Sequence, residues 1–479
     1  MLSRFIQKSK FTAIVVLVIS GGFSQNALQS GNQMTDVQDI IRKTDSILVS
    51  QHKPLGYGEK QHIVREIYSE AVDSLDHYLN RYASHSRFNG TVAVAKDGVV
   101  LFKKHHGYAD MDKRIPVSDT SKFQLASVSK QFTAAAILKL YQEGRINLDS
   151  SITTYIPELP YKRVKIRHLL THKSGFPSYM WIIARHWNEN YAPSNEDLVQ
   201  MISEHPVRLR FKPGKRFNYS NTGYCLLASV VERTSGLSFD EFLKDRFFDP
   251  LNMKRTFAFS SSDTAYTPDM VKGYNYHRSG YHEVSLNLMD GTYGDKGVFS
   301  TAEDLVKWTQ ALENGKVVDE SLVKNAFSET FLDGGKEVEY GYGFRIYTSN
   351  AYDMIFHNGS WSGFRTTLRT FPEDGLTIVI LTNNSFRDTG AMARNLTSAI
   401  YNDFEAGEVY DIVKSLILEG KELDSISKKS IVDSWELHEL RKVKRTVNSM
   451  NRRWMAHKIE RFTRDAAISD DTYYALKEK

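Results

Sequence analysis

The hydrophobic pattern of the first part of the chain predicts a helix, a β-hairpin and a second helix. From residue 67 to residue 82, apolar side chains recur every three or four positions, as on one face of an amphipathic helix. Apolar runs at 90–95 and 99–102 flank the turn pair Asp97-Gly98, which is typical of a hairpin. Residues 124–140 then lead into good helix formers with an apolar face. This order indicates a sheet backed by helices.

The pattern changes to helices and loops between about residue 150 and residue 300, and strands return later. We expect helices at 164–172 (ended by Gly175), 198–205 and 224–236 (ended by Gly236). Further strands are predicted at 354–356, 365–371 and 376–382, followed by a closing helix at 389–404. The order predicts an α/β (α+β) domain with a mainly antiparallel sheet, flanked by helices and carrying a mainly helical insertion.

The N-terminus has the pattern of a secretory signal peptide. Basic residues at 4, 8 and 10 precede an apolar run at 11–20, and small residues follow. The run is shorter than the roughly 20 residues that a membrane span needs, and an uncleaved N-terminal anchor is the alternative. We therefore expect a signal peptide at 1–24, a polar linker at 25–66, and an exported protein, either periplasmic or secreted.

The C-terminal segment 405–479 differs from the preceding domain, 67–404, in being highly charged and helical in pattern. Apolar residues from Leu440 to Trp454 recur every three or four positions among many Lys and Arg residues. One interpretation is a basic amphipathic helix that lies on a membrane surface or a protein partner. We favour the other, a helical extension that packs on the main domain with a solvated basic face.

Composition narrows the classes of function. The 479 residues carry a formal net charge of only +5, which gives no support to nucleic-acid binding. Cys225 is the single cysteine, so an intrachain disulfide and a Cys-based zinc site are excluded. Its apolar neighbours favour a small buried helix residue over a nucleophile. We expect no metal or organic cofactor, although His168 and His172 have helical His-x-x-x-His spacing.

The segment with the clearest chemistry is Ser127-x-x-Lys130, at the start of the predicted helix after 124. Residues three apart on a helix share a face, and the free N–H groups of a helix start suit a nucleophile that generates an oxyanion. Lys130 would be the nearby base. The same Ser-x-x-Lys pattern also begins at Ser50, Ser321 and Ser425, so it is weak evidence by itself.

Two downstream segments supply partners for this pair. Tyr219-Ser220-Asn221 offers a phenol that can exchange a proton and an amide that can hold a substrate carbonyl. His357-Asn358-Gly359-Ser360 offers an imidazole for proton relay or a substrate carboxylate, and a glycine that allows close backbone approach. Either segment alone is equally typical of an ordinary polar loop.

Taken in order, these motifs and their surroundings resemble a known family. The segments are LASVSKQFTA, LLTHKSGFP, PGKRFNYSNTGYCLL, GDKGVFSTAEDLVKW and HNGSWSGFRT. They are similar to the penicillin-recognising serine hydrolases, the branch that holds class C β-lactamases, serine D-alanyl-D-alanine carboxypeptidases and related esterases. The resemblance covers roughly residues 67–404 and implies a β-lactamase/transpeptidase-like fold.

Position by position, the resemblance implies a role for each motif residue. Ser127 would be the acylated nucleophile, and Lys130 and Tyr219 would transfer its proton, with the identity of the base left open. Asn221 would bind the acyl amide of a substrate. His357 and Gly359 would line the opposite wall, and the backbone N–H groups of Ser127 and Ser360 would form the oxyanion hole. The substrate would be a small molecule or a peptide.

The third motif departs from the β-lactamase pattern. β-Lactamases usually have Lys-Thr-Gly there, whereas this chain has His357-Asn358-Gly359, which resembles the carboxypeptidases and the esterase or aminopeptidase relatives. A titrating group thus replaces a permanent cation. We expect an exported serine hydrolase of the D-alanyl peptidase or esterase type; a β-lactamase and a non-catalytic sensor or interaction protein are the alternatives. His172, in LLTHKSG, is expected to be structural and distant from the chemistry.

Overall fold

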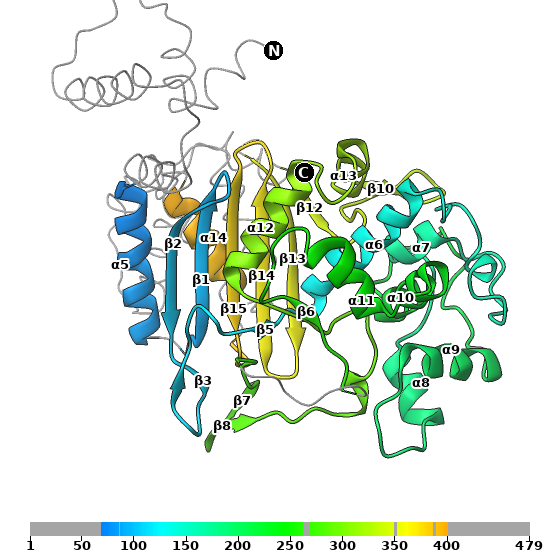
Figure 1. Ribbon diagram of the computed structural model, residues 1–479, viewed down its shortest axis with the longest axis horizontal. Helices are drawn as coiled ribbons and strands as arrows, with labels where there is room; N and C mark the ends of the chain where they lie inside the picture. Colours follow the sequence, from blue (N-terminus) through cyan, green and yellow to red (C-terminus); the bar gives the residue numbers. More distant parts are fainter. Residues whose placement is uncertain (1–68, 86, 262–268, 349–351, 387–388, 401–479) are drawn as a thin grey trace, which may run out of the picture.

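A six-stranded antiparallel sheet forms the centre of the molecule (Figure 1). The computed structural model describes residues 69–85, 87–261, 269–348, 352–386 and 389–400. In spatial order the strands are β12 (Arg345–Thr348), β13 (Asp353–Trp361), β14 (Phe364–Phe371), β15 (Leu376–Thr382), β1 (Gly90–Lys96) and β2 (Val99–His106). Because β1 pairs with β15, the first and last predicted strands share one sheet. The predicted fold class and the β1–β2 hairpin are confirmed.

Helices cover both faces of this sheet, which explains why its central strands β15 and β1 are buried on both sides. All seven residues of β15 are buried. Ile378 and Ile380 pack with α5 (Ser69–His85) and α14 (Thr389–Ile400), whereas Val379 and Leu381 belong to the larger core on the other face. That second face is covered by α12 (Ala302–Glu313), which Figure 1 shows in front of the sheet.

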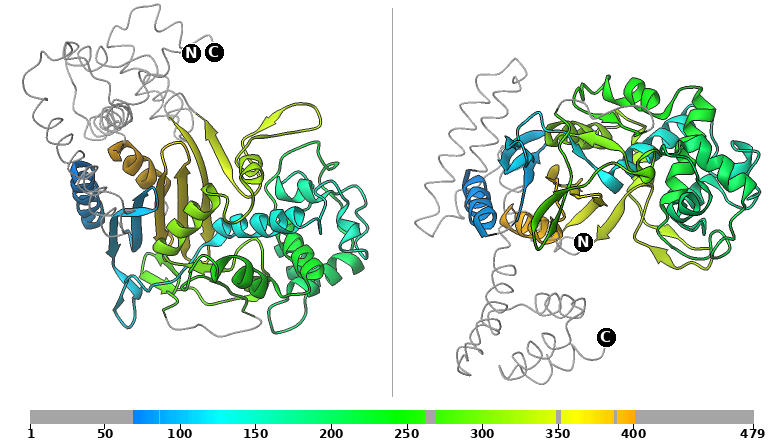
Figure 2. Two further views of the ribbon diagram at one scale, coloured as in Figure 1. Left: turned by 45° about the horizontal axis from the view of Figure 1, so that its top comes forward. Right: turned by 90° about the horizontal axis from the view of Figure 1, so that it is seen from below.

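The segment between β2 and β12 contains the predicted helical insertion, and most of its helices lie beside the sheet (Figure 2). Its helical elements are η1 (Ala126–Ser129), α6 (Lys130–Gln142), η2 (Ile152–Thr154), α7 (Ile166–Leu170), α8 (Tyr179–His186), α9 (Asn195–Glu204), α10 (Asn221–Ser235), α11 (Phe239–Leu243), the π-helical turn η3 (Lys244–Phe248), η4 (Leu288–Asp290), α12 and α13 (Glu320–Ala326). Its short strands are β3 (Tyr108–Asp110), β4 (Ile115–Pro116), β5 (Phe123–Gln124), β6 (Phe257–Ala258), β7 (Tyr274–His277), β8 (Gly280–Glu283), β9 (Val298–Ser300), β10 (Thr330–Phe331) and β11 (Glu337–Val338).

The predicted C-terminal end is correct for helix α10 but not for helix α7. Helix α10 ends at Gly236 in the left-handed conformation (φ +79°), as expected, and buries Cys225 completely. Helix α7, in contrast, does not continue to Gly175. It ends at Leu170, and two residues later His172 takes a positive φ of 55°. The early end directs the chain back toward α10.

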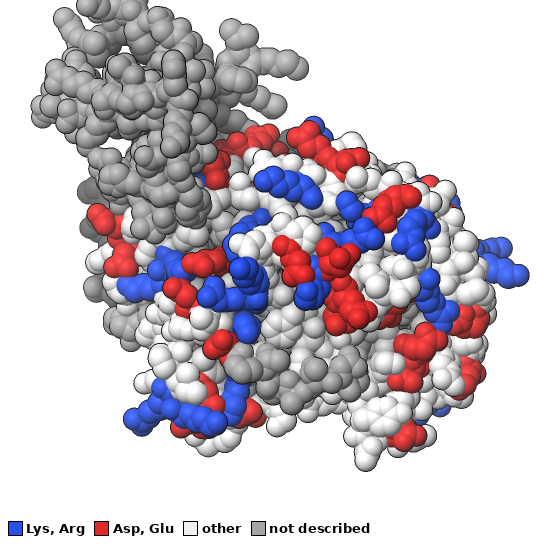
Figure 3. Space-filling model, viewed as in Figure 1, with Lys and Arg blue, Asp and Glu red and all other residues white. Residues whose placement is uncertain are grey.

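The remaining predictions concern the ends of the chain and its charge. The signal peptide at 1–24, the linker at 25–66 and the extension at 405–479 lie outside the described residues and stay predictions. None of the described helices is both long and apolar enough to cross a membrane. Acidic and basic side chains alternate over the face in Figure 3, which fits the small net charge.

Candidate active site

The turn that carries Ser127 is a strained 3₁₀ turn rather than a simple helix start. Ala126 has a φ of +49°, a conformation that non-glycine residues rarely adopt. Within the turn, Ala126, Val128 and Ser129 are buried while Ser127 is partly exposed. Backbone strain of this kind is typical of functional sites, where the surrounding structure imposes it.

Lys130, the first residue of α6, is completely buried and bonded to Ser127. Its Nζ donates hydrogen bonds to Ser127 Oγ (3.1 Å) and to the backbone oxygen of Asp295 (2.7 Å). The same nitrogen lies 5.1 Å from the ring centroid of Tyr219 and 5.5 Å from that of Tyr224. Aromatic faces and a carbonyl oxygen therefore hold this amine within proton-transfer distance of the serine.

Tyr219 and Asn221 lie on either side of the start of α10, where Ser220 is the extended N-cap residue. Asn221 is thus the first residue of helix α10, whereas the sequence predicted a polar loop at this position. Among the described residues, Tyr219 Oη, Ser220 Oγ and Asn221 Oδ1 are buried without a hydrogen-bond partner. An unpaired buried polar atom costs about 1–3 kcal/mol, so three together indicate a surface shaped to bind a polar group.

His357, on β13, is a neutral and fixed group. It is buried; its Nδ1 donates to the backbone oxygen of Asn358 (2.7 Å), and Tyr340 Oη donates to its Nε2 (3.1 Å). Burial, together with the nearby charge of Lys130, lowers the pKa of His357 to about 3. The sequence suggested a titrating group, but burial keeps this imidazole neutral at pH 7. Its ring centroid lies 6.1 Å from that of Tyr219.

Gly359 allows β13 to lie directly against the Ser127 turn. A Cβ added at this position would lie 2.2 Å from the backbone oxygen of Leu125 and 2.1 Å from Thr366 Oγ1. Thr366 Oγ1 already donates a hydrogen bond to that same oxygen (2.7 Å). Strand β13 and the turn that contains Ser127 are therefore in contact, and Ser360 is the next residue of this strand.

The structure adds a buried ion pair that we did not predict, formed by Asp295 and Lys296. Lys296 Nζ lies 3.5 Å from Asp295 Oδ1 and donates to Tyr179 Oη (2.6 Å), while Tyr179 Oη donates to Asp295 Oδ2 (3.2 Å). The pair holds the backbone oxygen of Asp295 against Lys130. Two charged residues between glycines, in the segment 294–297, were the available sequence signal.

Two further residues lie beside Tyr219: Arg345, which we did not predict, and His172, which we expected elsewhere. Arg345, half-buried on β12, places its Cζ 5.5 Å from the ring centroid of Tyr219 and 5.9 Å from that of Tyr340. No carboxylate in the described part of the chain pairs with it. His172, expected to be distant from the chemistry, has its ring centroid 4.2 Å from that of Tyr219. That expectation was wrong because α7 ends before His172.

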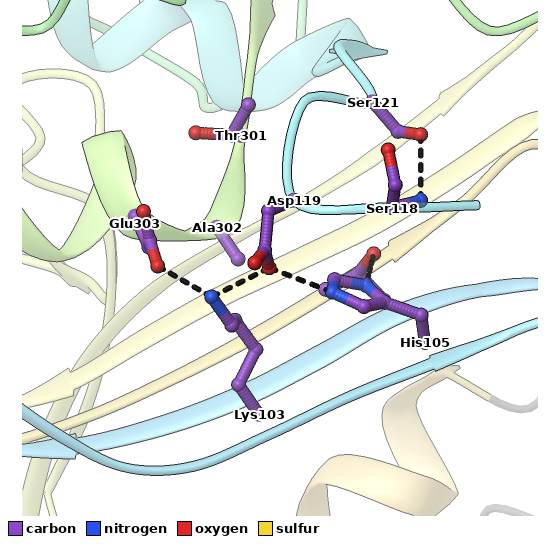
Figure 4. Close-up of a pocket in the computed structure, with 9 residues that line it drawn as sticks. Lys103, His105, Ser118, Asp119, Ser121, Thr301, Ala302 and Glu303 are labelled. Atoms are coloured by element: carbon purple, nitrogen blue, oxygen red, sulfur yellow. Dashed lines mark hydrogen bonds and ion pairs between the residues drawn. The ribbon is translucent and has the colours of Figure 1, made fainter.

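A small polar pocket elsewhere on the molecule contains none of the predicted site residues (Figure 4). Lys103 pairs there with Asp119 (2.6 Å) and with Glu303, and His105 Nε2 lies 2.8 Å from Asp119 Oδ1. These groups neutralise one another. Over the described ranges, no cluster of His, Cys, Asp and Glu residues is suited to hold a metal ion.

Comparisons with known proteins indicate the family of this chain. The family model described as Beta-lactamase matches residues 69–401. Penicillin-binding protein 4* of Bacillus subtilis (strain 168) is 32% identical over 346 residues, which cover 68% of this chain and 74% of that protein. The D-aminopeptidase of Gluconobacter oxydans (strain 621H) is 27% identical, and the match spans 66% of this chain but only 59% of the relative.

Comparison with a solved structure indicates which proteins share this fold. The octameric penicillin-binding protein homologue from Pyrococcus abyssi superposes with a TM-score of 0.59 at 26% sequence identity. The superposition covers 69% of this chain and 77% of that one. The sheet and the helical insertion are thus shared with penicillin-binding proteins.

Proposed function

Because the chain belongs to the β-lactamase family of serine hydrolases, we propose that it hydrolyses a peptide, ester or amide through an acyl-enzyme on Ser127. The observation that carries this proposal is the 3.1 Å hydrogen bond between Lys130 Nζ and Ser127 Oγ in a buried, aromatic environment. A serine becomes a nucleophile when a group in hydrogen-bond reach can accept its proton.

The proposed reaction has two steps. In the first, Ser127 Oγ attacks the substrate carbonyl carbon while the Lys130–Tyr219 pair takes its proton. The C–N or C–O bond then breaks, and the leaving group departs with a proton from the same pair. In the second step, water attacks the ester carbon and releases the acid and free Ser127. The backbone N–H groups of Ser127 and Ser360 would bind the oxyanion in both steps.

Charge in the site supports a substrate with a free carboxylate near the scissile bond. Arg345 is a permanent cation at the Tyr219 ring, and the carboxylate of Asp295 is occupied by Lys296 and Tyr179. A substrate ammonium would meet like charge here, whereas a carboxylate would meet a planar guanidinium suited to bidentate binding. This favours a carboxypeptidase over an aminopeptidase.

The configuration of the substrate is proposed from the relatives. The B. subtilis relative is a penicillin-binding protein, and the G. oxydans relative is a D-aminopeptidase. We propose a D-alanyl peptide, with an ester of similar shape as the second choice. We also propose that the protein acts outside the cytoplasm, on the basis of the N-terminal pattern.

Labelling of Ser127 tests the acyl-enzyme. The wild type should react with a fluorophosphonate and with a fluorescent penicillin, and Ser127→Ala should not react. Ser321→Ala is the matched control, because Ser321-x-x-Lys324 has the same spacing on the exposed side of α13. Labelling that persists in Ser127→Ala would overturn the assignment. A wild type that reacts with no probe would favour the non-catalytic interpretation.

A substrate panel tests the specificity. It contains an N-acyl-D-alanyl-D-alanine peptide, its C-terminal amide, a D-alanine anilide with a free amine, a short-chain ester and a chromogenic cephalosporin. The free acid should be hydrolysed at least about tenfold faster than its amide, and Arg345→Gln should remove this preference. Equal rates for acid and amide in the wild type would refute the role of Arg345. Rapid cephalosporin turnover would instead make the protein a β-lactamase.

A further inference from the structure

His172 occupies an unusual backbone conformation next to the proposed proton-transfer pair. The residue is buried and has a φ of +55°. Asparagine, aspartate and histidine are the non-glycine residues most often found there, and the conformation still costs of order 1–3 kcal/mol. A histidine in this strained conformation therefore indicates a role other than filling the core.

Two hydrogen bonds connect His172 to the backbone on either side of Tyr219. The N–H of Asn218 donates to the His172 backbone oxygen (2.9 Å), and the N–H of Ser220 donates to its Nδ1 (3.1 Å). The His172 ring also packs against the Tyr219 ring, with centroids 4.2 Å apart and planes at 37°. His172 thus holds the backbone before Tyr219, the ring of Tyr219, and the backbone after Tyr219.

The bond from Ser220 requires a neutral imidazole with its proton on Nε2. The charged and titratable groups that face His172 and Tyr219 are Lys130, His357, Arg345, Tyr224 and Tyr340. Burial, together with the charge of Lys130, lowers the pKa of His172 well below its usual range. Nδ1 therefore stays an acceptor at physiological pH, and the contact with Ser220 does not depend on pH there.

We propose that His172 is a positioning residue that holds the Tyr219 phenol beside Lys130 and Ser127. It acts through the backbone bonds to Asn218 and Ser220 and through the ring contact, without touching the substrate. The inference rests on the proposed function, because the group it positions is part of the proposed proton-transfer pair. A residue that only fills the core would be replaceable without regard to its acceptor.

Two substitutions separate the acceptor from the backbone conformation. Asparagine and glycine both tolerate a positive φ, but only asparagine offers an oxygen near the position of Nδ1. His172→Gly should lower kcat for p-nitrophenyl acetate by about 100-fold with little change in KM, because a displacement of about 1 Å in a catalytic group costs that much. His172→Asn should recover most of this loss.

A control distinguishes this effect from a general loss of structure. His168, on α7, also accepts a backbone hydrogen bond through Nδ1, from Lys165 (3.2 Å), but belongs to the cap of a helix. His168→Asn should keep wild-type kcat. Thermal unfolding of each variant gives the folded fraction. If His172→Gly does not fold, the kcat of His172→Asn is compared with the wild type, and a folded asparagine variant that has lost about 100-fold in kcat overturns the inference.

The outcomes separate the inference from the proposed function. Wild-type acylation of Ser127 tests the proposed function. The ratio of kcat between His172→Asn and His172→Gly, both folded, tests the role of His172. A glycine variant with wild-type kcat, or an asparagine variant no faster than glycine, overturns the inference while leaving the acyl-enzyme intact. Recovery by asparagine at unchanged KM supports it.

Discussion

The substitution Gly359→Ala tests whether contact between β13 and the Ser127 turn sets the geometry of the site. Gly359 has no positive φ, so an alanine there is not strained by its backbone, and any effect must come from its Cβ. That atom would meet Thr366 Oγ1 at 2.1 Å, Leu125 O at 2.2 Å and Ala126 Cβ at 3.1 Å.

The expected magnitude follows from these distances. Ordinary contacts of a Cβ begin at about 3.4 Å, so strand and turn must separate by roughly 1 Å. The turn oxygen cannot rotate away, because it belongs to the backbone directly before Ala126. A displacement of this size costs about 100-fold in rate, and overpacking of a buried site costs about 1–3 kcal/mol of stability. Acylation should therefore fall about 100-fold in a protein that stays folded, because a domain typically has about 5–15 kcal/mol of unfolding free energy.

The assay is the rate at which a fluorophosphonate labels Ser127, measured together with the urea unfolding midpoint. Gly334→Ala is the matched control, since Gly334 also lacks a positive φ and nothing lies within 4 Å of its added Cβ. It should leave both quantities unchanged. The reasoning is refuted if Gly359→Ala labels at the wild-type rate, because strand and turn would then not be in the contact described.

Three further predictions follow from the same structure. Lys130→Met should slow acylation of Ser127 by about 10²–10⁴-fold in the labelling assay, whereas Lys324→Met, in Ser321-x-x-Lys324, should not. The pKa of His357 is about 3 in the folded state and 6.5 when unfolded, so its contribution to stability is complete above pH 6.5 and is lost as pH falls toward 3. Between pH 7.5 and pH 5 this loss is about 2 kcal/mol, and in urea unfolding His357→Gln should show a pH dependence smaller by that amount. Thr301 accepts from a backbone N–H at the start of α12, so Thr301→Ala should lower the unfolding free energy by about 1 kcal/mol in the same assay.

The sheet was predictable because its strands have local patterns that burial enforces. The run at 376–382 is mostly apolar, and the structure buries it between helices on both faces. The Asp97-Gly98 turn fixed the first hairpin. The contact between Ser127 and Lys130 was predictable for a similar reason, since residues three apart on a helical turn are neighbours.

The rest of the site depends on contacts that no local pattern encodes. Tyr219 was found through resemblance, because nothing in its own neighbourhood indicates proximity to Lys130. Lys130 donates a hydrogen bond to the backbone oxygen of Asp295, and every residue has such an oxygen. His172 was misplaced because helical periodicity carried the prediction past Leu170, while the left-handed turn depends on the packing of α7 against α10.

These placements change how the pH dependence of the enzyme should be interpreted. The histidine of the third motif suggested a group that titrates near neutral pH. In the structure, His357 and His172 lie on two sides of Tyr219, and burial lowers the pKa of each, to about 3 for His357. Neither changes charge between pH 6 and pH 8, so both act as neutral hydrogen-bonding groups in that range. An inflection of the acylation rate near neutral pH would therefore belong to neither of these two histidines.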